Sequence, residues 1–333
     1  MKYKKWLSFL FLIPVFFIAS ASYYLLQDFG TYYEYSPEPA KMIKPAHLLD
    51  DYGYASYQPL VLYPMQSAPG DFLIIETASP FTGDELTISF DFPGTVSSIY
   101  QPGNLLYAVV AISYEASPGR YEITISQQGD ENIYINTEVD IIDKEFRLSR
   151  FSMPASRTEG WTAARLAEDR EKVRAARSTT VPHPLWIQKF IHPLDVRVSS
   201  EYGAIRIINE NPPRRHSGID LAADEGAPII APNDGIVRLA EFLLSGGNTV
   251  IIDHGLNLSS TYMHLHEIYV EVGQKINRGD TLGTVGMTGY ATGPHLHWEV
   301  NIGQVPVNPE QLLDNDLLWI PPAYINTLID SNN

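Results

Sequence analysis

The sequence predicts a mainly β protein with two β domains joined by a helical linker. Short apolar or alternating segments recur through residues 58–313, turn residues separate them, and only one stretch has a helical pattern. Short strands at this spacing are typical of sandwiches and barrels. We therefore expect a small β-sandwich over residues 58–150, a helical linker over 151–184 and an all-β domain over 185–313.

Five strand-like segments define the first β domain. They lie at residues 71–76, 86–90, 105–113, 121–125 and 134–142. Turn pairs such as Pro93-Gly94 and Pro118-Gly119 fall between them. This spacing suggests an immunoglobulin-like sandwich. The segment contains no cluster of His, Asp and Glu, so we expect it to act as a spacer, a binding module or a structural support.

A helix is expected from Ser156 to about Arg177. Ser156 or Thr158 can cap its start, and its larger apolar positions are Trp161, Leu166 and Val173. Residues 27–57 before the sandwich have no sustained period and are predicted to be a linker.

The last domain returns to strands and tight turns. Strands are expected at residues 228–231, 235–239, 248–253, 258–263, 268–272, 281–285 and 295–301. Residues 314–333 form a C-terminal tail with enough apolar side chains to pack on something.

Composition excludes several kinds of function. The net charge is -16, from 39 acidic and 23 basic residues, which argues against a nucleic-acid binder. The chain has no cysteine, which excludes thiol catalysis, a thiolate zinc site and disulfides.

The first 26 residues have the features of an export signal. Lys2, Lys4 and Lys5 precede a long apolar stretch that ends near a small-x-small sequence, Ala19-Ser20-Ala21. This pattern indicates a cleaved secretory signal peptide. The alternative is an uncleaved membrane anchor, because residues 6–26 are just long enough to span a bilayer. Both alternatives place the remaining residues outside the cytoplasm, in the cell envelope or secreted.

The strongest chemical signal is a set of three histidine-containing segments in the last domain. These are His216-Ser217-Gly218-Ile219-Asp220, Tyr262-Met263-His264-Leu265-His266 and His295-Leu296-His297-Trp298-Glu299. On a strand, alternate residues share a face, so His295, His297 and Glu299 should point away from Leu296, Trp298 and Val300.

Imidazole and carboxylate groups are zinc ligands, and a catalytic zinc site uses three of them and keeps one open position. The His295/His297 pair can supply one or two ligands, and His216 and Asp220 can supply the others, with Gly218 allowing the chain to bend between them. An isolated histidine is more often a solvated or hydrogen-bonding group, and this is our interpretation of His47, His183, His192 and His254.

The order His-x-x-x-Asp, Tyr-x-His-Leu and His-x-His resembles the M23 (lysostaphin-type, or LytM) zinc peptidases of bacterial peptidoglycan. The resemblance covers roughly residues 199–313 and includes the segments Ser199-Ser200-Glu201-Tyr202-Gly203 and Gly286-Met287-Thr288-Gly289. It implies one Zn²⁺ per chain, bound by His216, Asp220 and His297, with His264 and His295 as catalytic histidines that do not bind the metal.

Two further residues are weaker candidates for substrate contact. His266 lies where the family often has a small polar residue, and on a regular strand it would share a face with His264. It is more readily interpreted as a bystander. Tyr202 is similarly more readily interpreted as a core residue.

The resemblance implies a zinc endopeptidase that cuts peptide bonds in peptidoglycan stems or cross-bridges, with peptidoglycan as its partner. One alternative is a catalytically silent LytM-type activator or scaffold of other cell-wall hydrolases. Such a protein should lack one or more of the five site residues, and all five are present here. A second alternative is a different zinc hydrolase, such as a D,D-carboxypeptidase.

Overall fold

A computed structural model of the chain describes most residues between 60 and 313. The described ranges are 60–64, 66–78, 86–101, 105–127, 130–186 and 188–313. The predicted signal or anchor (1–26), the linker (27–57), His47 and the tail (314–333) lie outside them. Within the described part, no helix is long and apolar enough to cross a membrane.

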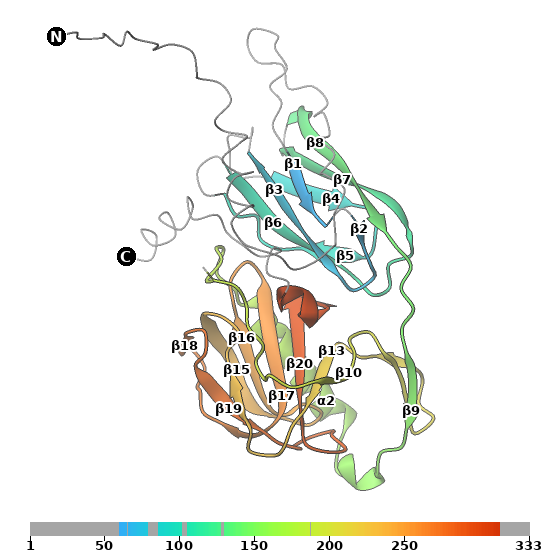
Figure 1. Cartoon of the computed structure of the whole chain (residues 1–333), viewed down its shortest axis with the longest axis vertical. Coiled ribbons are helices and arrows are strands. Elements are labelled where there is room, and N and C mark those ends of the chain that lie inside the picture. Colours follow the sequence, from blue (N-terminus) through green and yellow to red (C-terminus); the bar gives the residue numbers. More distant parts are fainter. Residues whose placement is uncertain are drawn as a thin grey trace, which may run out of the picture. The chain divides into compact units, whose positions relative to one another are not determined.

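The N-terminal β region consists of two four-stranded sheets (Figure 1). One sheet has the order β1-β3-β6-β5, with bounds Leu60–Tyr63, Phe72–Ala78, Leu105–Ile112 and Gly94–Val96. The other has the order β2-β8-β7-β4, with bounds Gln66–Ser67, Asp130–Ile141, Gly119–Gln127 and Leu86–Phe90. All five predicted segments are strands, and the short strands β1, β2 and β5 are additional.

Strand β3 explains why this region contains continuous apolar runs. Leu73 and Ile75 belong to a core that the two N-terminal sheets share, whereas Phe72 and Ile74 belong to the main core with residues of the C-terminal domain. A strand that is buried on both faces needs apolar residues at every position. The continuous run therefore reflects two cores, one on each side of the sheet.

The helical segment starts later than predicted. A short 3₁₀ helix, η1 (Ala155–Arg157), precedes helix α2 (Ala163–Ser178). Thr162 caps α2, because its side chain accepts a hydrogen bond from the Arg165 backbone N–H at 3.2 Å. The expectation that Ser156 or Thr158 caps the helix was wrong: Gly160, at φ 75°, separates the two helical segments.

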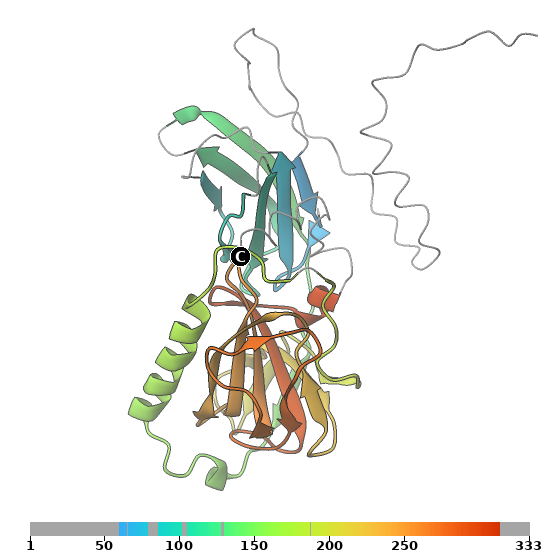
Figure 2. The ribbon, with the colours of Figure 1, turned by 90° about the vertical axis from the view of Figure 1, so that its left-hand side faces the viewer.

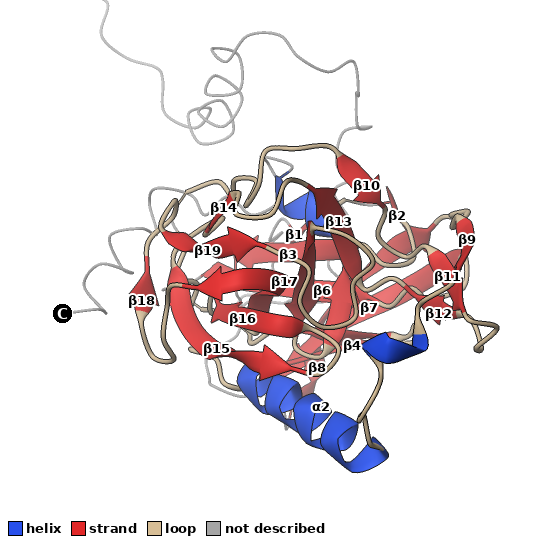
Figure 3. Ribbon diagram, turned by 90° about the horizontal axis from the view of Figure 1, so that it is seen from below, coloured by secondary structure: helices blue, strands red, loops and turns tan. Residues whose placement is uncertain are grey.

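The C-terminal domain is built on a ten-stranded sheet with the central order β10-β13-β20-β17-β16-β15-β18. Its longer strands are β13 (Gly218–Ala222), β15 (Gly235–Leu243), β16 (Gly247–Asp253), β17 (Leu258–Ile268), β19 (Thr281–Val285) and β20 (His295–Ile302). Its short strands are β10 (Val198–Ser200), β14 (Pro228–Ile230), β18 (Lys275–Ile276) and β21 (Val305–Val307). Helix α2 lies beside this sheet along β15 (Figures 2 and 3).

A separate three-stranded sheet has the order β12-β11-β9, with bounds Arg214–Arg215, Ile205–Ile208 and Leu148–Phe151. Strand β9 comes from the segment before the helix and pairs in parallel with β11. The segment between strand β8 and helix α2 therefore contributes a strand that pairs with the C-terminal domain.

One predicted strand of the C-terminal domain was wrong. Strand β17 ends at Ile268, and residues 269–272 form no strand. Tyr269 and Val272 are 53% and 63% exposed, so these apolar side chains are not core positions. An apolar segment alone does not distinguish a strand from an exposed loop.

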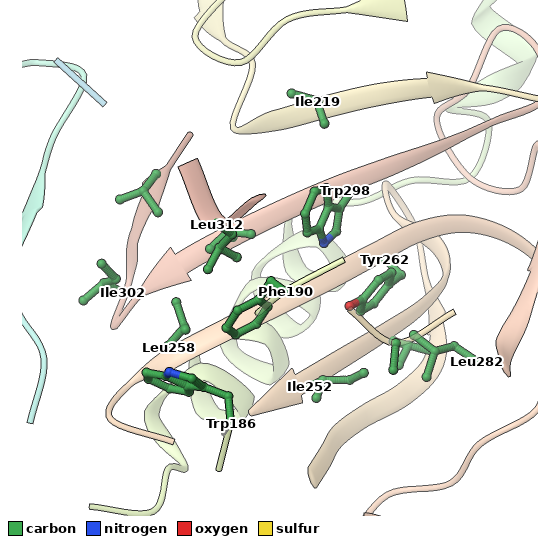
Figure 4. Packing of buried hydrophobic residues seen from close by; sticks show 14 of the residues in the cluster. Trp186, Phe190, Ile219, Ile252, Leu258, Tyr262, Leu282, Trp298, Ile302 and Leu312 are labelled. Atoms are coloured by element: carbon green, nitrogen blue, oxygen red, sulfur yellow. The ribbon is translucent and has the colours of Figure 1, made fainter. Parts of the chain in front are cut away.

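The main core lies on one face of β20. Leu296, Trp298 and Val300 are fully buried in it, and Trp298 lies in the same cluster as Ile219 and Tyr262 (Figure 4). This confirms that these three residues point away from the histidine face. Because β20 pairs with β13 on one side and β17 on the other, its opposite face is where side chains from three strands meet.

Candidate metal and catalytic site

Strand pairing brings the three predicted metal ligands together. Asp220 of β13 lies directly opposite His297 of β20, and His216 lies just before β13. The candidate ligand atoms are His216 Nε2, Asp220 Oδ1 and His297 Nδ1. Each of the three distances between them is 2.9 Å. All three residues are buried. Their ligand atoms are close enough for one ion to contact all three with bonds of about 2.0–2.2 Å.

Gly218 matters for close packing rather than for bending. It lies within the regular strand β13, and a Cβ there would be 2.2 Å from the Trp298 carbonyl oxygen. The expected role as a bend was therefore wrong. A glycine is needed because β13 and β20 approach so closely at this point.

Each ligand is held by a second group. His216 Nδ1 donates to the Glu201 carbonyl at 2.8 Å, which leaves its Nε2 lone pair facing the cluster. Asp220 directs Oδ1 at the two imidazoles while Arg206 donates to its Oδ2. Second partners of this kind are typical of metal ligands, since they fix the tautomer and orientation. The donor set therefore fits a zinc ion with three protein ligands.

His297 is supported through Glu299, two positions along β20. The Glu299 carboxylate lies 3.7 Å from His297 Nε2 and accepts hydrogen bonds from Arg177 and Ser217, each at 2.9 Å. The side chains of Glu299 and Arg177 are only 5% and 10% exposed. Arg177 belongs to helix α2, so a residue of the linker helix reaches the support of a candidate metal ligand.

The cluster holds two ionised carboxylates, Asp220 and Glu299, and His297 must release its proton when a metal binds. Burial raises the pKa of Asp220, but the hydrogen bonds from His216 and His297 lower it by more. The pKa therefore lies below its ordinary value, and the carboxylate is ionised. Burial also lowers the pKa of His297, while the carboxylates of Asp220 and Glu299 raise it to about 9. Burial raises the pKa of Glu299, and Arg177 lowers it to about 2.

His264 and His295 lie beside the cluster. Their rings are 4.8 Å apart, and His295 Nε2 is 3.8 Å from Asp220 Oδ1. His264 Nδ1 is bonded to the Thr288 carbonyl at 2.9 Å, and His295 Nδ1 to the Gly293 carbonyl at 2.8 Å. Both rings therefore keep Nε2 available. Burial lowers the pKa of His264 to about 3, so this imidazole is neutral near pH 7.

Three of the five histidine and aspartate residues of the site line a cleft. Asp220, His264 and His295 line a cavity of about 460 Å³ together with Arg206 and Tyr290. Strand β9 forms part of the opposite wall through Ser149 and Phe151. The cavity gives a substrate access to the two histidines that are not in the candidate ligand set.

The structure does not bring His266 into this cleft. His266 is exposed and its Nδ1 contacts Glu225 Oε1 at 2.9 Å. His264 has a positive φ of 67°, which breaks the regular alternation of β17, so the expectation that both histidines share a face was wrong. This position fits the interpretation of His266 as a bystander.

Tyr202 is a core residue. It is 5% exposed, its hydroxyl donates to the Pro306 carbonyl at 2.7 Å, and it is not among the residues that line the cleft. Its position favours core packing over substrate contact.

For His254, the interpretation as a hydrogen-bonding group is confirmed. It is fully buried, with Nδ1 bonded to the Asp234 carbonyl at 2.7 Å and Nε2 to Ser260 Oγ at 2.8 Å. It has no place in the metal cluster.

Neither Arg206 nor Arg177 was recognisable from sequence as a residue of the candidate site. Arg206 lies in the four-residue strand β11, which no periodicity indicates. Arg177 contacts a residue 122 positions away. Only Glu299, which shares the histidine face of β20, had a detectable signal.

Two histidines and a carboxylate at a cleft, with further histidines beside them, are the donor set of a metal-dependent hydrolase. Residues 214–309, which lie in the C-terminal domain, match Peptidase family M23.

Known proteins are similar to parts of the chain. Peptidoglycan DD-endopeptidase ShyA of Vibrio cholerae is 42% identical over 93 residues, which are 28% of this chain and 22% of that protein. DD-carboxypeptidase/endopeptidase Mpg of Neisseria meningitidis is 40% identical over 96 residues, which are 29% of this chain and 22% of that protein. The matches span a third or less of the length of these curated relatives.

One solved structure is similar over a longer part of the chain. It is a Pseudomonas aeruginosa protein assigned to peptidase M23, with 26% identity and a TM-score of 0.56. The match covers 74% of this chain and 95% of the other. Since this is more than residues 185–313 contain, the likeness extends into the preceding β region or helix.

Proposed function

We propose that the chain is a zinc endopeptidase that hydrolyses peptide bonds in peptidoglycan stems or cross-bridges. The observation that carries the proposal is the convergence of His216 Nε2, Asp220 Oδ1 and His297 Nδ1 beside His264 and His295 at an open cleft. The M23 domain and the names of its relatives ShyA and Mpg support the substrate class.

His216, Asp220 and His297 would hold one zinc ion. When bound, zinc polarises the scissile carbonyl and acidifies a water molecule. His264 is neutral and buried, so its Nε2 can accept the proton of the attacking water. The proton that His264 accepts can pass to the neighbouring His295, whose Nδ1 is held by the Gly293 carbonyl. Once it holds that proton, His295 Nε2 can hydrogen-bond the developing negative charge and deliver the proton to the leaving amine.

Two other activities compete with this proposal. A silent activator or scaffold should have lost part of the site, whereas all five residues are present and assembled here. A D,D-carboxypeptidase would use the same zinc chemistry, and the name of Mpg combines both activities. The two peptidase activities differ in their products, since a carboxypeptidase releases single terminal residues.

The organisation of the whole chain is part of the proposal. A peptidoglycan substrate requires a location in the cell envelope, which agrees with a signal peptide or membrane anchor over residues 1–26. We further propose that the two N-terminal sheets form an immunoglobulin-like sandwich, with domain boundaries near residues 58, 150, 184 and 313.

Mass spectrometry of purified peptidoglycan treated with the zinc-loaded protein tests the function. We expect fragments from internal stem or cross-bridge bonds, and none with a His297→Ala variant that has an unchanged circular dichroism spectrum. Full activity of His297→Ala would contradict the proposal. Release of single terminal residues alone would instead indicate a carboxypeptidase.

A further inference from the structure

The catalytic cleft continues into a second, larger cavity. The second cavity has a volume of about 820 Å³ and lies between helix α2 and the C-terminal sheet. The two cavities share Arg206, Ile208 and Tyr290 in their linings. Trp161, which precedes α2, lies against Tyr290 with ring centroids 5.6 Å apart. A bound chain could therefore extend from His264 and His295 into the space beside α2.

The floor and walls of the second cavity are largely apolar. Leu166 and Val173 of α2 face it, and Leu243 and Met263 line it from the sheet. Such a surface suits short aliphatic side chains.

Arginines surround both cavities although the chain has a net charge of -16. The lining arginines are Arg147, Arg170, Arg174, Arg177, Arg206 and Arg214. Three of them are engaged in ion pairs: Arg174 with Glu171, Arg177 with Glu299 and Arg206 with Asp220.

The other three arginines are available to a ligand. Within the described ranges, Arg147, Arg170 and Arg214 form no ion pair. Besides Asp220 and Glu299, the lining contains two carboxylates, Glu201 and Asp169, and Asp169 already accepts the Leu244 backbone N–H at 2.7 Å. A guanidinium without a partner at a cleft is suited to bind a carboxylate.

We propose that the cleft binds an extended acidic peptide, with the scissile amide at the metal site and carboxylates at Arg170 and Arg214. The inference deepens the proposed function, on which it rests for the identity of the peptide as a peptidoglycan stem. The positive lining selects stems with free carboxylates over stems in which these groups are amidated.

Binding and cleavage are measured separately to test this. The probes are a fluorescein-labelled stem pentapeptide with free carboxylates and its counterpart with carboxamides in their place. Anisotropy with a zinc-loaded His264→Gln variant measures binding, and product analysis with the otherwise unchanged protein measures cleavage. Arg170→Gln combined with Arg214→Gln is compared, in the same background, with Arg165→Gln, an exposed arginine of α2 that does not line the cavity.

We expect the free-carboxylate peptide to bind more tightly than its carboxamide counterpart. The double substitution should weaken its binding about tenfold, because it removes the two guanidinium partners of the peptide's carboxylates at an exposed surface. Arg165→Gln should leave the affinity unchanged, and the preference should decline as salt is added.

Equal binding of both peptides, or an unchanged affinity in the double variant, would overturn the inference while leaving hydrolysis intact. If the double substitution changed only the sedimentation coefficient, and so the oligomeric state, the second cavity would be a contact between copies of the chain. The inference would then also be wrong. Carboxylate-dependent binding without any cleavage would support the inferred peptide-binding role of the two cavities and contradict the proposed hydrolytic function instead.

Discussion

At the scale of single residues, the candidate site depends on groups that hold the ligands in one orientation. The Glu201 carbonyl fixes His216, Arg206 fixes Asp220, and Glu299 lies behind His297. Partners of metal ligands commonly affect metal affinity or activity by about 10–100-fold. Residues without direct metal contact should therefore affect zinc binding strongly.

Arg177→Met should weaken zinc binding about tenfold or more. The substitution leaves the buried Glu299 carboxylate without its ion-pair partner, so His297 loses a fixed acceptor at Nε2. Competition with a chromophoric chelator measures the affinity. Arg174→Met is the matched control, because Arg174 lies on the same helix and pairs only with the exposed Glu171.

An unchanged zinc affinity in Arg177→Met would show that the helix does not support the metal site. Because loss of one partner of a buried pair is also destabilising, Arg177→Met combined with Glu299→Gln serves as a second test. The double variant leaves no uncompensated charge at position 299, and its zinc affinity should still be lower than that of the unchanged protein.

At the scale of elements, strand periodicity predicted which side chains share a face, whereas the first residue of the helix was predicted wrongly. Alternation along residues 295–301 correctly separated the histidine face from the core face, because neighbours on a strand must point in opposite directions. The start of α2 was ambiguous because several Ser and Thr residues could act as caps. The choice of Thr162 depends on the left-handed turn at Gly160, which no periodicity encodes.

Thr162→Ala should destabilise the protein by about 1 kcal/mol, because it removes the side-chain acceptor for the Arg165 N–H. Ser156→Ala, which removes a hydroxyl outside the helix, should have a much smaller effect. Urea denaturation followed by circular dichroism measures both. A larger loss in Ser156→Ala than in Thr162→Ala would place the functional start of the helix where the sequence suggested it.

At the scale of the whole molecule, what sequence reasoning missed lies in contacts between distant segments. The M23 domain was predictable because its motif residues are grouped in three short segments. Strand β9, Arg177 and Arg206 come from outside these segments. Strand β9 and Arg177 reach the site only when the part of the chain before the C-terminal domain packs beside it, and Arg206 reaches Asp220 from strand β11. Such long-range contacts have no local pattern by which they could be recognised.

Buried histidines should make global stability depend on pH. Burial lowers the pKa of His254, so the unfolded chain binds a proton more readily than the folded protein. Its contribution is fully present above about pH 6.5 and is lost as the pH falls below that value, by about 1.4 kcal/mol per pH unit for one proton.

Urea denaturation of the metal-free protein from pH 7.5 to pH 5 measures this slope. In His254→Gln the slope below pH 6.5 should decrease by about one proton, that is by about 1.4 kcal/mol per pH unit. An identical slope in both proteins would mean that His254 does not remain neutral in the folded state.

The central claim is that His216, Asp220 and His297 together bind one zinc ion. Anomalous diffraction at the zinc edge from crystals of the zinc-loaded protein tests it most directly. We expect one peak about 2.0–2.2 Å from His216 Nε2, Asp220 Oδ1 and His297 Nδ1. No peak at this position in zinc-loaded crystals, or a peak bound by other residues instead, would contradict it.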